Sequence, residues 1–499
     1  MDERFDLVIR GGTVYDGTGA PGVRADVGVR SDRVVAVGEI AARGGEETDA
    51  RGLAVTPGFI DVHSHDDYAV LLEPEMEFKA LQGVTSDVVG NCGSGVVPFD
   101  AGLIRFRRIH PAANPEPWDG FAGYLERVDA VRPSCNVAVL MGHGSLRRGA
   151  MGLEPRAPAP DEMRRMTAWV REGVEAGAVG LSTGLIYEPG RYAGTDEVIA
   201  LGREVAAAGG GLYATHMRNE ADGLLDAVRE AIRIGEEAGV PVQISHHKAS
   251  GRLNWGRVRD SLGLIEQARA RGLDVTADQY PYTAGSTSLF AVLQNGSFRS
   301  DSPGGLGRLE GADVLIAFAP THAEWEGRRL AALAAEWCLD DEATARRVVE
   351  AEGEACFVVV FTMDEADVKT VMAHPTTMIG SDGVPAGGKP HPRLYGCFAR
   401  VLGHYVREVQ VLDLPTAIHR MTGMPAAKFE LRDRGVIRPG AFADLVVFDP
   451  ARIADVATYD EPRRSPAGIH AVYVNGIAVA REGRHTGARP GRALRRGRA

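Results

Sequence analysis

Eight short apolar segments that end in polar residues constrain the fold of this chain more than any other feature of its sequence. They alternate with helix-like stretches and cover residues 56–65, 84–92, 136–144, 178–185, 211–217, 241–248, 274–280 and 376–382. Strands that alternate with helices are typical of parallel βα units, and eight such units complete a (β/α)8 barrel. We therefore expect an α/β fold built on a TIM-like barrel.

Short strand-like segments separated by glycine turns flank this central region. They fill residues 5–55 and return at 443–450 and 471–479. Because the termini of a domain often lie close together, we expect one small β-sandwich made from residues 1–55 and 431–499.

The barrel would then occupy residues 56–430. Its longest interval between strand-like segments contains residues 286–356, which are rich in Ala, Arg and Glu. This composition predicts a helical insertion after the seventh strand.

Composition restricts the partners of the chain. Of its 499 residues, 44% are hydrophobic and 25% charged, and the formal net charge is −11. An acidic chain is poorly suited to nucleic acid or an anionic membrane, so the expected partner is a small-molecule substrate. No signal-peptide pattern and no apolar run of ~18 residues is found, so we expect a cytoplasmic protein. The five scattered cysteines do not indicate a disulfide framework.

Several residues that can bind a metal stand where the predicted strands end, which is where a barrel places its chemistry. A lone cysteine or a His-x-His pair is equally compatible with buried structural residues. Their coincidence at the ends of strands one, two, five, six and eight predicts a site, and imidazole with thiolate suits zinc. The candidates are His63, His65, Cys92, His216, His246 and Asp382.

These motifs resemble the amidohydrolase superfamily over nearly the whole chain. The likeness rests on TPGFIDVHSH (56–65), on the histidines of strands five and six, and on GVIRPGAFADLVVFD (435–449). Many members carry a lysine at the end of strand four, whereas this strand reads GLSTGL. In one subgroup, the N-acyl-D-amino-acid deacylases or D-aminoacylases, a cysteine on strand two replaces that lysine. The stretches GNCGSG, YATHMRNE and QISHHK are similar to the motifs of that subgroup.

The resemblance implies a role for each matching position. Cys92, His216 and His246 would hold a tightly bound zinc, while His63 and His65 would form a second, weaker or empty metal position. Asp382 would be the catalytic acid–base. The substrate would be bound by a carboxylate clamp and a pocket tyrosine, formed by Lys248, Tyr280, Arg393 and Tyr187.

The expected reaction is zinc-dependent hydrolysis of the amide bond of N-acyl-D-amino acids, giving a carboxylate and a free D-amino acid. The uncharged stretch STSLFAVLQ at residues 286–294 favours neutral or hydrophobic side chains. The preference for the D-enantiomer rests on the resemblance alone.

Two alternatives remain open at this point. The first is another amidohydrolase, such as a hydantoinase, dihydroorotase or isoaspartyl dipeptidase, although these usually carry the strand-four lysine. The second is a non-catalytic barrel used in assembly, although such relatives tend to lose metal ligands. The sequence leaves undecided the acyl group, the physiological substrate, the occupancy of the second metal position and whether the protein is a homo-oligomer.

Overall fold

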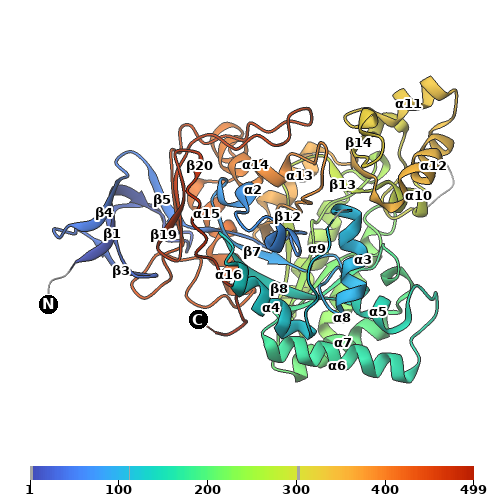
Figure 1. Ribbon diagram of the computed structural model, residues 1–499, viewed down its shortest axis with the longest axis horizontal. Coiled ribbons are helices and arrows are strands. Elements are labelled where there is room, and N and C mark those ends of the chain that lie inside the picture. Colours follow the sequence, from blue (N-terminus) through green and yellow to red (C-terminus); the bar gives the residue numbers. More distant parts are fainter. Residues whose placement is uncertain (1–3, 112, 300–303, 499) are drawn as a thin grey trace.

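The computed structural model describes residues 4–111, 113–299 and 304–498. Its centre is a sheet of eight parallel strands (Figure 1). In pairing order these are β16 (Thr377–Ile379), β12 (Val275–Gln279), β11 (Val242–Ile244), β10 (Leu212–His216), β9 (Gly180–Gly184), β8 (Asn136–Gly142), β7 (Val84–Val89) and β6 (Phe59–Asp61). The expected α/β barrel is confirmed.

The barrel closes between β6 and β16 through the residues that follow these two strands. The backbone N–H of Asp382 donates to the carbonyl oxygen of His63 at 2.7 Å, and that of His65 donates to Gly383 at 3.0 Å. Ser64 and Gly383 form an isolated parallel bridge. The bonds that close the barrel therefore also bring candidate site residues from strands one and eight together.

Helices cover the barrel because each has an apolar face. α8 (Leu224–Ala238) buries Leu224, Val228 and Ala231, among others, at helical spacing. All six residues of β7 are buried, as expected for a parallel strand covered on both sides. The other helices around the barrel include α4 (Gly120–Val131), α6 (Pro160–Ala176), α7 (Thr195–Ala207), α9 (Val258–Ala270), α13 (Glu365–Ala373) and α15 (Leu414–Met421).

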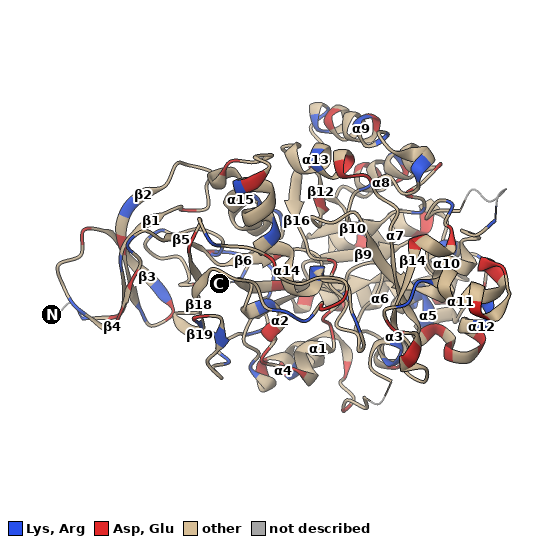
Figure 2. Ribbon diagram, turned by 90° about the horizontal axis from the view of Figure 1, so that it is seen from above, with Lys and Arg blue, Asp and Glu red and all other residues tan. Residues whose placement is uncertain are grey.

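Further helices fill the connections between strands and helices. They are α1 (Ala69–Leu72), α2 (Glu77–Ala80), α3 (Phe99–Ile109), α5 (His143–Met151), α14 (Arg393–Arg400), the π-helix η6 (Val401–Glu408) and α16 (Gly423–Lys428). Acidic and basic residues are interspersed over the outer helices (Figure 2). Within the described part of the chain, no helix combines the length and apolarity needed to cross a membrane.

Strands from both ends of the chain form a separate nine-stranded sheet beside the barrel. The pairing of β5 with β17 joins the two sets of strands. The first set is β1 (Phe5–Val14), β2 (Val23–Arg30), β3 (Arg33–Gly38), β4 (Gly44–Asp49) and β5 (Ala54–Pro57), and the second is β17 (Leu445–Phe448), β18 (Ile469–Val474), β19 (Ile477–Arg481) and β20 (Arg484–His485).

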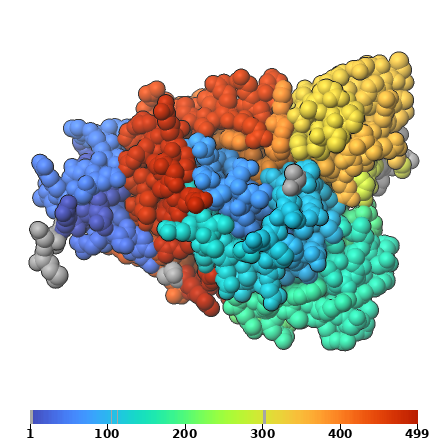
Figure 3. All heavy atoms as spheres, viewed as in Figure 1, coloured from blue at the N-terminus to red at the C-terminus, as the bar shows by residue number. Residues whose placement is uncertain are grey.

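The segment after β12 forms a projection at the opposite end of the molecule from this sheet (Figure 3, yellow to orange). It contains β13 (Gly285–Ser288), α10 (Leu289–Gln294), β14 (Val314–Phe318), α11 (Leu330–Trp337), α12 (Asp341–Glu352) and β15 (Phe357–Val360). The three strands pair antiparallel in the order β13-β15-β14. The expectation of a helical insertion was therefore wrong in part. About half of the Ala, Arg and Glu residues lie in α11 and α12, whereas VLIAF and FVVV are apolar strand sequences rich in β-branched residues.

Candidate metal centre and active site

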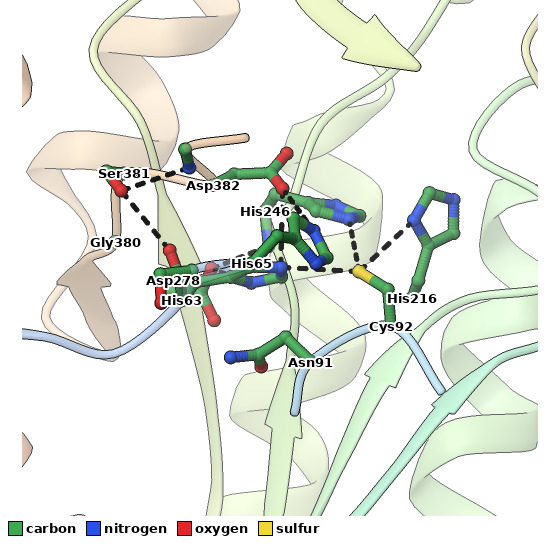
Figure 4. A network of polar contacts seen from close by, with 12 residues as sticks. His63, His65, Asn91, Cys92, His216, His246, Asp278, Gly380, Ser381 and Asp382 are labelled. Carbon is green, nitrogen blue, oxygen red and sulfur yellow. Dashed lines mark hydrogen bonds and ion pairs between the residues drawn. The ribbon is translucent and has the colours of Figure 1, made fainter. Parts of the chain in front are cut away.

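The predicted metal-binding residues converge at the carboxyl ends of the barrel strands. Two groups of side chains place their ligand atoms within 4.8 Å of one another. One is Cys92, His216 and His246, and the other is His63, His65, Cys92 and Asp382. The two groups meet at Cys92, whose sulfur lies among imidazoles from three strand ends (Figure 4).

The distances between ligand atoms can be compared with those around zinc. The Cys92 Sγ lies 3.3 Å from His63 Nε2, 3.5 Å from His246 Nε2 and 3.8 Å from His216 Nδ1. With tetrahedral geometry, a Zn–S bond of about 2.3 Å and Zn–N bonds of about 2.0–2.1 Å separate sulfur and nitrogen by about 3.6 Å. The residues present therefore fit a zinc ion.

The charges at the site favour a cation. Burial opposes ionisation of the Cys92 thiol, but the charges of His63 and His246 outweigh it and hold its pKa well below the usual range. Burial also opposes ionisation of Asp382, yet Arg393 and the neighbouring histidines hold the pKa of that carboxyl well below its usual range. A thiolate and a carboxylate thus face the space between the imidazoles.

Asp382 is held by charged groups on both of its oxygens. His65 Nε2 lies 3.1 Å and His63 Nε2 3.5 Å from Oδ1, and Arg393 Nη2 lies 2.9 Å from Oδ2. The Arg393 guanidinium also stacks over the Tyr280 ring at 4.3 Å. Its Nε and Nη1 are buried and have no hydrogen-bond partner among the described residues, so it retains donors for a further acceptor.

The centre opens into a cavity of about 1710 Å³ that continues into solvent. Lys248, Tyr280 and Tyr187 line this cavity as predicted substrate-binding residues should, whereas Arg393 is not among the lining residues that the structure describes. The Tyr187 ring lies 4.8 Å from the ring of His216. The structure thus brings three of the four predicted substrate-binding residues to the cavity wall and places Arg393 behind Asp382.

Glu220 is a buried residue of the site that the sequence reasoning missed. Its Oε1 accepts a hydrogen bond from Lys248 Nζ at 2.6 Å and lies 3.0 Å from His246 Nδ1, and its Oε2 lies 3.8 Å from His216 Nε2. Burial opposes its ionisation, but Lys248 and the two histidines hold the pKa of Glu220 below its usual range. Burial and Lys248 lower the pKa of His246, while Glu220 and the other nearby anions raise it overall to about 9.

A second missed feature is a buried charge cluster beneath the centre. Lys79, on α2, is fully buried and directs its Nζ at the carboxylates of Asp61, Asp66 (3.1 Å) and Asp87 (3.7 Å) and at Ser381 Oγ (3.0 Å). Asp61 in turn accepts from the backbone N–H of Ser381 at 2.8 Å. The cluster therefore fixes the residue that precedes the candidate catalytic aspartate.

Three site residues have left-handed backbone conformations. The φ angles are 53° at Cys92, 35° at His246 and 49° at Asp382. Such conformations cost a non-glycine residue on the order of 1–3 kcal/mol each and cluster at functional sites. The surrounding structure must therefore hold these three residues in place.

Comparisons with known proteins place this chain in a family. The profile of the Amidohydrolase family matches residues 46–480. D-aminoacylase and N-acyl-D-glutamate deacylase, both of Alcaligenes xylosoxydans xylosoxydans, are each 42% identical to this chain, over 99% of it and 98% of their own lengths. A similar solved structure is the crystal structure of N-acyl-D-glutamate deacylase from Bordetella bronchiseptica, complexed with zinc and a phosphonate inhibitor that mimics the tetrahedral intermediate. It superimposes on this chain with a TM-score of 0.88 and 41% sequence identity, and the match covers 99% of this chain and 100% of that one.

Proposed function

The chain belongs to the amidohydrolase family, and on this premise we propose that it is a zinc-dependent deacylase of N-acyl-D-amino acids. It hydrolyses the amide bond and releases a carboxylate and a free D-amino acid. The observation that carries the proposal is the Cys92 sulfur, placed 3.3–3.8 Å from three imidazole nitrogens beside a strand four, β9, that has no lysine.

Cys92, His216 and His246 hold the zinc, and His63 and His65 form a second position next to it. When bound, zinc polarises the amide carbonyl and the attacking water, the two groups that hydrolysis must activate. His246 directs Nε2 at Cys92, while its Nδ1 lies 3.0 Å from Glu220 Oε1 and 2.8 Å from Lys248 Nζ, so these two charged groups fix the orientation of the ring.

Asp382 acts as the general base and then as the general acid. Its low pKa keeps it ionised near neutral pH, so it can accept a proton from the attacking water. The same carboxyl then delivers that proton to the leaving amine, as general acid–base catalysis by one positioned group requires. His65 and Arg393, on opposite oxygens, fix its orientation.

Lys248 and Tyr280, which line the cavity, bind the α-carboxylate of the substrate. Lys248 Nζ is a triple donor that lies in the cavity wall and is oriented by Glu220. The Arg393 guanidinium lies 2.9 Å from Asp382 and stacks on the Tyr280 ring, so it adds positive charge behind the cavity wall.

Neutral or hydrophobic amino-acid side chains are preferred. Where β13, α10 and the segments near them line the cavity, they present Ser286, Thr287, Phe290, Leu306 and Phe357. None of these five is a cation, and their apolar members favour aliphatic or aromatic side chains. The two arginines among the described residues that line the cavity, Arg108 and Arg148, lie on α3 and α5 instead, and Arg108 is paired with Glu354.

The test is the release of acetate from N-acetyl-D-methionine and N-acetyl-D-leucine, compared with their L-enantiomers and with N-acetyl-D-glutamate. We expect hydrolysis of the neutral D-substrates and little of the others. Opening of cyclic ureides without release of acetate would overturn the proposal in favour of a hydantoinase. Faster hydrolysis of N-acetyl-D-glutamate would overturn only the side-chain preference.

A further inference from the structure

One buried carboxylate outside the cavity, that of Asp278 on β12, contacts both groups of candidate metal ligands. Its Oδ1 lies 3.0 Å from His63 Nδ1 and accepts from the backbone N–H of His246 at 2.7 Å. Its Oδ2 accepts from Gln243 Nε2 at 2.8 Å. Asp278 is 1% exposed, so these three donors, and not solvent, satisfy the carboxylate.

The contact with His63 selects the tautomer of that imidazole. When Nδ1–H donates to Asp278, Nε2 carries the free lone pair, and Nε2 is the atom that lies 3.3 Å from Cys92 Sγ. A carboxylate behind a histidine ligand fixes the ring and increases its basicity. Asp278 therefore presets His63 for coordination.

The contact with His246 acts on the backbone instead of the ring. His246 has a φ of 35°, a conformation that needs support from its surroundings. The His246 N–H bond to Asp278 Oδ1 and the bond from the His247 N–H to the Asp278 carbonyl at 2.8 Å provide that support. The turn that directs His246 Nε2 at Cys92 is thus held by the same residue that orients His63.

We propose that Asp278 is a positioning residue that couples the two metal positions, because one oxygen of its carboxylate sets a ligand of each. The inference rests on the proposed function only in that these ligands hold zinc. Asp278 is not among the described residues that line the cavity. Its loss should therefore weaken metal binding and turnover and leave substrate affinity nearly unchanged.

The test compares Asp278→Asn with Gln243→Met. The asparagine keeps the shape and the oxygen acceptor but removes the charge. The methionine removes the bond to Oδ2 and leaves both contacts of Oδ1 intact, so it controls for damage to the same part of the core. Zinc occupancy is measured by atomic emission after equilibration of each protein with graded amounts of a chelator of known zinc affinity.

We expect Asp278→Asn to weaken zinc binding by about 10- to 100-fold, the range found when partners of metal-binding histidines are removed. Gln243→Met should change it by less than about threefold. In zinc-saturated protein, kcat of Asp278→Asn should fall while KM stays within about threefold. If Asp278→Asn does not fold, Asp278→Glu keeps the charge but shifts the oxygens by one methylene, and it should also bind zinc at least about tenfold more weakly.

Zinc binding by the folded Asp278 variant at the wild-type level would overturn the inference. An equal loss in Gln243→Met would also overturn it, because the effect would then be a general loss of packing. Zinc binding is measured without substrate. A protein whose zinc affinity depends on Asp278 but which hydrolyses no N-acyl-D-amino acid would therefore leave this inference standing and refute the proposed function.

Discussion

Replacement of Lys79 by methionine tests how the buried charge cluster beneath the centre contributes to stability. Methionine has a similar length and fills the site, but it removes the cation that faces Asp61, Asp66 and Asp87. Breaking a buried ion pair by removing one partner typically costs about 3–5 kcal/mol, because the opposite charge stays buried and unpaired. If the barrel unfolds as one unit, this corresponds to a decrease in Tm of about 4–6 °C.

The loss of stability in Lys79→Met should depend on pH. Burial already raises the pKa of Asp87 well above its usual range, against the effect of Lys79, and removal of Lys79 raises it further. When the pKa of a carboxyl is higher in the folded than in the unfolded protein, its protonated form stabilises the fold. This stabilisation is lost as the pH rises from about 4 through the folded pKa. The deficit of Lys79→Met should therefore be smaller at pH 5 than at pH 8.

The assay is thermal unfolding of wild type and variant between pH 5 and pH 8, followed by circular dichroism. Lys369→Met is the matched control, because Lys369 forms an exposed i,i+4 pair with Glu365 at 3.8 Å, and such pairs contribute about 0.5 kcal/mol or less. A Lys79→Met protein as stable as wild type at pH 8, or a deficit that does not shrink on acidification, would refute the reasoning.

Three further predictions concern the ligands, the cavity and a remote lysine. Wild-type protein should contain about one tightly bound zinc per chain, and Cys92→Ala should lose both the metal, measured by elemental analysis, and the activity. Lys248→Met should lower kcat/KM for N-acetyl-D-methionine by about 10- to 100-fold, as expected for loss of a charge-assisted hydrogen bond, and an unchanged value would contradict its role in the clamp. Burial lowers the pKa of Lys428 to about 8. Its positive charge therefore destabilises the folded protein below that pH, and this destabilisation decreases toward pH 10. The Tm of wild type relative to Lys428→Met should therefore increase between pH 8 and pH 10.

The barrel and the convergence of the candidate metal ligands could be predicted from the sequence for one physical reason. Parallel strands of a barrel end at the same face, so residues far apart in sequence can be assigned to one site once the strand ends are recognised. His216 and His246 are examples, because each follows an apolar segment directly. The order in which the strands pair is not needed to assign these residues to one site.

The supporting residues could not be found in this way. Glu220 lies four residues beyond the end of β10, and only the folded loop directs it back onto Lys248. Asp278 stands beside Thr and Gln in VTADQ, and Lys79 stands beside Glu77 in EFKA, so no local pattern predicted that either charge is buried or which partner it has. Arg393 was expected in the cavity wall, and its position behind Asp382 depends on α14, whose placement no local pattern determines.

The pairing of β5 with β17 has a consequence for biosynthesis. The partner of β5 leaves the ribosome only after all eight barrel strands, so the early strands cannot complete their sheet while the barrel is being translated. Contacts between segments so distant in sequence form slowly, and unpaired strand edges exposed in the meantime invite association with other chains. Completion of the small sheet should thus be the last step of folding, and this step would decide how much newly made protein escapes aggregation.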